Sequence, residues 1–332
     1  MMKKDINGKE KPGLPELFDE LPSQKQKNAR SNEASRYRSY LLSPLIAAAL
    51  PLKDVKKNLF ERKYNNITLR ITGGIKVPYG KYGRLLLSIL TTHAVLEKNS
   101  ADGKPVILRY SNLQQLLNEL QLPKQRGKEI KEQLECFSNA SFIFEEKKAK
   151  IAQKSLFKDF YGEDESLEGE VTATKVSTGI VPFFEAFQYI DLDDGIEKKT
   201  VAFEIVLSEK FTRLSQVHSV PIDYTAYKGI TSVVGKDLYA WFVYRNNSLS
   251  EPIFISRRSM VEQFMPVKED ANEAQERVNW DYIKEQIKII KTKYYSDLNI
   301  SFNDDNSGLT LSKSKPIMLD SDRRYVLVTA NI

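Results

Sequence analysis

The chain has 332 residues with a net charge of +6, and its 41% hydrophobic and 28% charged residues are ordinary for a globular protein of about two domains. This composition excludes an intrinsically disordered chain, and no apolar run approaches the ~20 residues of a membrane-spanning helix. The single cysteine, Cys136, excludes an internal disulfide framework, and the two histidines, His93 and His218, are too few for an imidazole metal site, so we expect a cytosolic protein without metal, cofactor or membrane contact.

The first part of the chain has two distinct compositions. Residues 1–52 begin with prolines and a polar run and predict a largely disordered N-terminal arm. Residues 53–84 then carry nine Lys and Arg against two Asp and Glu. Within them, residues 53–63 interleave charged and apolar side chains and predict an amphipathic basic helix. This helix is either a solvated surface or a set of phosphate contacts, formed by Lys53, Lys56, Lys57, Arg62 and Lys63.

The next segment predicts helices and strands in the order of a winged-helix unit. Apolar spacing and breakers indicate helix 82–96, strand 106–110, helix 111–121, helix 129–137 and strand 141–145. Ser111 is the expected N-cap of the second helix, and Pro123 separates the second helix from the third. The long segment 147–200, with a turn at residues 193–195, is interpreted as a wing, a linker or a dimer element.

The C-terminal part repeats that order. The expected elements are helix 236–246, strand 252–255, helix 256–264, helix 276–294 and strands 298–303 and 308–312. The sequence IKEQL at residues 130–134 recurs as IKEQI at residues 283–287. The repeat predicts an α+β fold of two tandem winged-helix domains, each a helix-turn-helix plus a β-hairpin, related by pseudo-duplication. The domains are expected at residues 53–180, with a long wing or loop insertion, and at residues 181–332.

The helix-turn-helix of the first unit is helix 111–121 with helix 129–137, and that of the second unit is helix 256–264 with helix 276–294. In such a pair the later helix contacts the major groove. In both expected units this helix has an apolar stripe and basic residues on another face, interleaved with acidic residues. It is therefore either a DNA-contacting helix or a surface helix with ion pairs four residues apart. The candidate DNA contacts are Lys124, Gln125, Arg126, Lys128 and Lys131 in the first unit and Arg277, Asn279, Lys284, Lys288 and Lys291 in the second. Candidates for base edges are Gln125, Arg126, Arg277 and Asn279, and candidate wing contacts are Lys313 and Lys315.

Two blocks of sequence carry a further signal. The first is VPYG at residues 77–80 with RLLLSILTT at residues 84–92; the second joins Leu207-Ser208, Phe211, VPID at residues 220–223 and DLYAWFVYR at residues 237–245. Together, over residues 75–318, these blocks resemble the signature of RepA-type plasmid replication initiators. Arg84 and Arg245 lie in these blocks on apolar helices, where each could bind a phosphate or a carboxylate, and Arg84 is a secondary candidate for a phosphate contact.

The resemblance implies a bacterial cytoplasmic protein that binds direct repeats, called iterons, at a plasmid origin and melts adjacent AT-rich DNA. It implies partners as well: double-stranded DNA at the iterons and at its own promoter, the host initiator, the replicative helicase and a second copy of the chain, in plasmid copy control. The residues alone leave open a winged-helix transcriptional repressor or partition protein that does not melt DNA. Because no catalytic pairing of side chains is recognisable, we expect no enzymatic activity.

Overall fold

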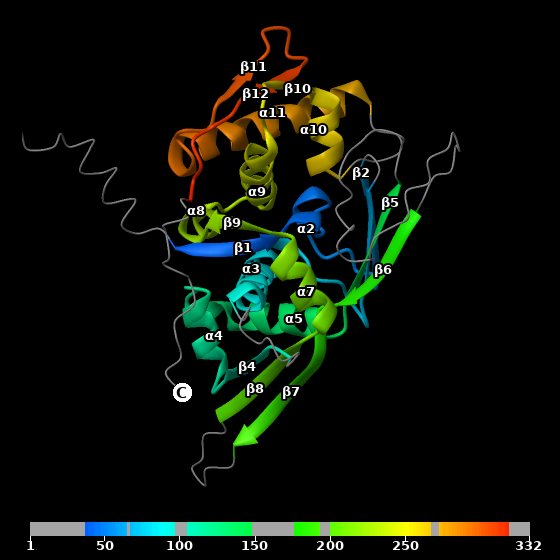
Figure 1. The fold of residues 1–332 in the computed structure, drawn as a ribbon, viewed down its shortest axis with the longest axis vertical. Coiled ribbons are helices and arrows are strands. Elements are labelled where there is room, and N and C mark those ends of the chain that lie inside the picture. The colour runs from blue at the N-terminus through cyan, green and yellow to red at the C-terminus, as the bar shows by residue number, and fades with distance from the viewer. Residues whose placement is uncertain are drawn as a thin grey trace, which may run out of the picture. The chain divides into compact units, whose positions relative to one another are not determined.

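Figure 1 shows the fold in a computed structural model, which describes residues 37–64, 67–96, 105–147, 176–192, 200–266 and 272–318. All of these residues belong to one compact unit. Helices alternate with small antiparallel sheets, so the described part of the chain has a mixed α/β architecture. The first 36 residues of the expected arm and the turn expected at residues 193–195 lie outside the described residues.

Residues 37–52 form part of the core, so the expectation of a disordered arm is wrong for them. β1 (Arg38–Leu42) pairs antiparallel with β9 (Ser219–Asp223), and α2 (Ser43–Ala47) follows β1 directly. Most of the apolar side chains over residues 41–50 are buried. The segment is ordered because β1 pairs with β9. No local sequence pattern could indicate this pairing, because β9 lies far along the chain.

Residues 53–63 do not form the expected helix. They lead into the first strand of a sheet whose members, in spatial order, are β2 (Leu59–Tyr64), β3 (Ile67–Thr72), β5 (Ser141–Lys147) and β6 (Val176–Pro182). The inner face of β3 is fully buried through Leu69 and Ile71. Along β2, exposed residues (Leu59, Glu61 and Lys63) alternate with half-buried ones (Phe60 and Arg62), which is the two-residue period of a strand.

The helices expected in the first unit form, but the hairpin beside them is made by strands other than the one expected. The members of this unit are α3 (Gly80–Leu96), β4 (Ile107–Tyr110), α4 (Leu113–Glu119), the 3-10 helix η2 (Lys124–Arg126), α5 (Gly127–Ser138), β7 (Phe184–Leu192) and β8 (Thr200–Leu207). In space β8 lies between β4 and β7. The strand expected at residues 141–145 forms as β5 but belongs to the other sheet. The N-cap of α4 is Asn112 and not Ser111, because the Asn112 side chain accepts a hydrogen bond from the Gln115 N–H.

The elements of the second expected unit follow the same order, without the two inserted strands, β5 and β6, that come after α5 in the first. The members of this unit are α9 (Val233–Ser248), β10 (Ile253–Ser256), α10 (Arg257–Phe264), α11 (Glu273–Ile289) with the π-helical turn η3 (Ile290–Tyr294), β11 (Ile300–Phe302) and β12 (Gly308–Leu311). β12 lies between β10 and β11, as β8 lies between β4 and β7. Ser256 caps α10, as predicted, by accepting a hydrogen bond from the Ser259 N–H. A strand, two helices and a hairpin whose last strand is central therefore occur twice.

The boundary expected between residues 180 and 181 falls inside β6. The sheet of the first unit is completed only by β8, which ends at Leu207. α7 (Glu209–Val217) then packs on α3, and α8 (Tyr224–Gly229) links β9 to α9. A boundary at residue 181 is therefore wrong, because β7 and β8 complete a sheet that begins with β4.

The first helices of the two units meet at a buried ion pair. Arg84 of α3 and Asp237 of α9 lie 153 residues apart, which is also the offset of the IKEQ repeat. Arg84 Nε and Nη2 donate to the two Asp237 carboxylate oxygens at 2.6 and 2.7 Å. Its remaining N–H groups donate to the carbonyls of Leu50, Pro51 and Gly80 at 2.6 to 3.0 Å. Arg84 is 2% exposed, so the expected phosphate contact there is wrong and the carboxylate alternative is the one observed.

Candidate nucleic-acid interface

The basic face of α5 is open to solvent. Its opposite face is buried through Ile130, Leu134 and Phe137, which lie at the spacing predicted from the sequence. All five candidate contacts of the first unit are exposed: Lys124, Gln125, Arg126, Lys128 and Lys131. The helix therefore buries its apolar stripe and presents its cations on the other side.

Two of these cations have partners within the protein. Arg126 Nη1 lies 3.0 Å from Glu129 Oε1 in an exposed pair three residues apart. Lys131 Nζ lies 5.4 Å from the centre of the Tyr189 ring on β7. Exposed contacts of both kinds contribute little to stability, so both side chains remain able to turn toward a ligand. The interaction with Tyr189 also places the basic face of α5 beside the hairpin of its own unit.

α11 divides its residues in the same way. Trp280, Ile283, Ile287 and Ile290 are buried, whereas Arg277, Lys288 and Lys291 are exposed. Arg277 Nη2 lies 2.7 Å from Glu273 Oε1, and Lys291 Nζ donates to the Ile300 carbonyl at 3.4 Å. Asn279 is half-buried and accepts a hydrogen bond from Gln275 Nε2 at 3.2 Å. The face that holds most of the predicted contacts of α11 is therefore accessible.

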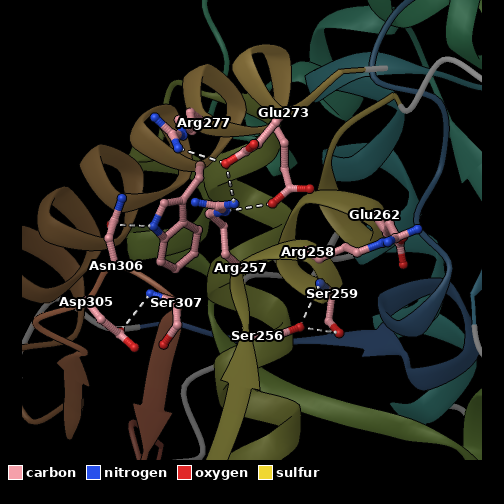
Figure 2. Close-up of polar contacts among 12 residues, drawn as sticks. Ser256, Arg257, Arg258, Ser259, Glu262, Glu273, Arg277, Asp305, Asn306 and Ser307 are labelled. Carbon is pink, nitrogen blue, oxygen red and sulfur yellow. Dashed lines mark hydrogen bonds and ion pairs between the residues drawn. The ribbon is translucent and has the colours of Figure 1, made fainter. Parts of the chain in front are cut away.

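Lys284 differs from the other lysines of α11. Its side chain is 24% exposed, with Nζ 2.8 Å from Asp281 Oδ1. Nζ also donates to Asn306 Oδ1 at 2.9 Å, and Trp280 Nε1 donates to the same oxygen at 2.8 Å. Asn306 lies in the turn between β11 and β12 and has a φ of +60°, a conformation that asparagine adopts more readily than most residues. Figure 2 shows this turn beside α11. The hydrogen bonds from Trp280 and Lys284 to Asn306 join α11 to the hairpin.

The two candidate wing contacts follow β12. Lys315 is exposed, and Lys313 Nζ donates a hydrogen bond to the Asn246 carbonyl at the end of α9. Asn246 itself exchanges two hydrogen bonds with the backbone of Ser314. The strand that leaves the hairpin is thus anchored on α9, with Lys315 accessible next to the anchor.

The secondary phosphate candidates divide into two groups. Lys53, Lys56 and Lys57 are exposed, and Lys63 is exposed and paired with Glu61 at 3.1 Å. Arg62 is half-buried, donates to the Gln263 carbonyl of α10 at 3.4 Å, and has its pKa lowered by burial. In β2, Arg62 reaches α10, so Arg62 contributes to the packing of the protein.

Sequence reasoning missed Arg257 and Arg258, the first two residues of α10. Arg257 Nε lies 2.6 Å from Glu276 Oε1 of α11, and its backbone N–H donates to the Ser307 carbonyl at 2.7 Å. Arg258 is exposed and lies 2.8 Å from Glu262. The signal in the sequence is the pair of arginines directly after the N-cap Ser256. The start of a helix favours anions, so two cations there are unusual and indicate an anionic partner.

His93, one of the two histidines, has a structural role. His93 Nε2 lies 2.6 Å from Glu119 Oε1, and the Tyr110 hydroxyl donates to Glu119 Oε2 at 2.8 Å, so His93 belongs to a partly buried network. No group of three His, Cys, Asp or Glu that could hold a metal lies among the described residues. Within the same residues, no helix is long and apolar enough to cross a membrane.

No family model and no curated protein sequence matches the chain. Among solved structures, the chain is similar to domains 2 and 3 of RctB, with 11% identity over 80% of this chain and 94% of that one and a TM-score of 0.45. A second structure of the same RctB domains gives 11% identity over 82% and 99% of the two chains, with a TM-score of 0.45. The Pi initiator protein in complex with iteron DNA gives 13% identity over 83% and 94%, with a TM-score of 0.42.

Proposed function

We propose that the chain is a DNA-binding protein with two winged-helix units, which bind duplex DNA through α5 and α11. The observation that carries this proposal is the order of elements that occurs twice, in β4-α4-α5-β7-β8 and in β10-α10-α11-β11-β12, with the last strand central each time and with β5 and β6 inserted after α5 in the first. In both units the second helix buries an apolar stripe and exposes basic residues. Such a helix beside a hairpin has the form of a major-groove helix with its wing.

The contacts follow from the exposed side chains. The exposed lysines of the two helices, together with Lys53, Lys56 and Lys57, bind phosphates, and their number sets the salt dependence of binding. Gln125 and Arg126, directly before α5, and Asn279, in the second turn of α11, are the residues that contact base edges. The buried pair of Arg84 and Asp237 fixes the two units against each other, so both helices meet the DNA as one body.

We further propose that this protein is a plasmid replication initiator. It binds iterons at the origin and its own promoter, forms homodimers, opens AT-rich DNA, and engages the host initiator and the replicative helicase in the bacterial cytoplasm. The resemblance of residues 75–318 to RepA-type initiators supports this assignment. It acts without catalysis: binding energy from several protomers on adjacent repeats offsets the deformation of the duplex, which costs on the order of 1–6 kcal/mol per bent site.

The second candidate is a transcriptional repressor or partition protein that uses the same two units. This candidate is favoured because the basic residues exposed on α5 and α11 account for DNA binding but not for DNA opening. Footprinting on the flanking plasmid DNA, combined with a probe of unpaired bases, separates the two functions. We expect protection of direct repeats together with opening of adjacent AT-rich DNA when host initiator is added. Protection without opening would leave the repressor, and no protection of any duplex would refute both.

A further inference from the structure

Two arginines from different helices converge on one carboxylate at the start of α11 (Figure 2). Arg277 Nη2 lies 2.7 Å from Glu273 Oε1, and Arg257 Nη2 lies 4.0 Å from the same oxygen. Arg257 is held independently by Glu276, whose Oε1 lies 2.6 Å from Arg257 Nε. The Glu273 carboxylate therefore lies between two guanidinium groups.

Exposure separates the two acidic residues. The side chains of Glu273 and Arg277 are 66% and 63% exposed, whereas those of Glu276 and Arg257 are 24% and 22% exposed. A ligand from solvent can therefore take the place of Glu273 while Arg257 stays in position on Glu276. The hydrogen bond from the Arg257 backbone to Ser307 ties this position to the hairpin turn.

The chemistry of the site is that of a phosphate site. A guanidinium donates two parallel N–H groups, which match the oxygens of a carboxylate or a phosphate, and a phosphodiester offers two oxygens to two arginines. The site lies between the first turn of α10, the first turn of α11 and the turn between β11 and β12. A major-groove helix is flanked by the sugar-phosphate backbone, so α11 in a groove brings these arginines near a phosphate.

We propose that Arg257 and Arg277 form a binding site for a backbone phosphate of duplex DNA, and that Glu273 fills this site in the free protein. The inference rests on the proposed DNA-binding function. DNA then binds by displacing Glu273, which acts as a competitor within the protein. Because exposed ion pairs are weak, this competition lowers the affinity for DNA only a few-fold and keeps the site from binding stray anions.

The test uses the full-length protein and the duplex that it selects from a random pool. Dissociation constants are measured at one salt concentration for the parent, Glu273→Gln, Arg277→Met and the double variant. Glu262→Gln is the matched control, because Glu262 pairs with exposed Arg258 at 2.8 Å outside the site. We expect Glu273→Gln to bind about two- to five-fold more tightly, from the usual strength of exposed ion pairs. The gain with Glu262→Gln should be smaller, and Arg277→Met should abolish the gain from Glu273→Gln.

Several outcomes would overturn the site. These are a Glu273→Gln gain no larger than that of Glu262→Gln, a gain that persists beside Arg277→Met, and weaker binding by Glu273→Gln. Thermal midpoints with added inorganic phosphate separate free anion from DNA: a rise with Glu273→Gln that Arg277→Met removes, together with a DNA affinity of Glu273→Gln equal to that of the parent, would show a site for the free ion and refute the assignment to DNA. If the parent selects and binds no duplex, the proposed function itself fails.

Discussion

Replacement of Asp237 by Asn tests the junction between the two units. The two side chains are nearly the same size, so packing is conserved, but the buried Arg84 loses its only carboxylate partner among the described residues. The guanidinium keeps its hydrogen bonds to three backbone carbonyls, while the new amide directs N–H groups toward those of Arg84. Removing one partner of a buried pair typically costs about 3–5 kcal/mol, which here is a large share of a typical free energy of unfolding.

The assay is thermal unfolding followed by circular dichroism. A loss of about 3 kcal/mol corresponds to a midpoint lower by about 4 °C for a chain of this size. Asp281→Asn is the control, because Asp281 forms an exposed pair with Lys284 and its loss should move the midpoint by less than about 2 °C. A midpoint within 2 °C of the parent for Asp237→Asn would refute the conclusion that this ion pair holds the two units together.

Three further predictions follow from individual residues. Lys288→Ala should lower the salt slope of DNA binding by about one unit with an unchanged thermal midpoint. Lys284→Ala should lower both the salt slope and the thermal midpoint, because Lys284 also binds the hairpin turn. Salt slopes equal to that of the parent would contradict phosphate contacts by these two lysines. Burial and the nearby Arg84 lower the pKa of Lys236 to about 7. Between pH 7 and 9 the unfolded chain therefore binds a proton that the folded chain lacks. The free energy of unfolding, measured in urea, should rise with pH over this range by up to about 1.4 kcal/mol per pH unit. Lys236→Met should flatten that rise, and an equal slope in both proteins would contradict the assignment. Gly80→Ala places a side chain at a φ of +67° and should cost about 1–2 kcal/mol in urea unfolding; no loss would show that the turn before α3 relaxes.

Several structural features are readable from short stretches of the chain. α5 and α11 were predicted because their apolar residues recur every three or four positions, which is a property of the helix itself. The cap of α10 at Ser256 depends on residues within one turn. The repeat of IKEQ pointed to the duplicated connectivity for the same reason, since each copy carries its own local pattern. The exposed basic residues of both helices followed from these faces.

The tertiary structure decided everything that depends on a distant partner. β1 is ordered because β9 lies beside it, β2 is a strand because β3 and β5 continue its sheet, and the hairpin of the first unit is β7 with β8 because β8 pairs with β4. Arg84 looked like a phosphate contact until the fold brought Asp237 to it, and Arg257 gained a role only beside α11. The role of a charged side chain and the pairing of a strand depend on neighbours in space that can lie far along the chain. A helix, in contrast, forms its backbone hydrogen bonds and its buried face within one segment of sequence.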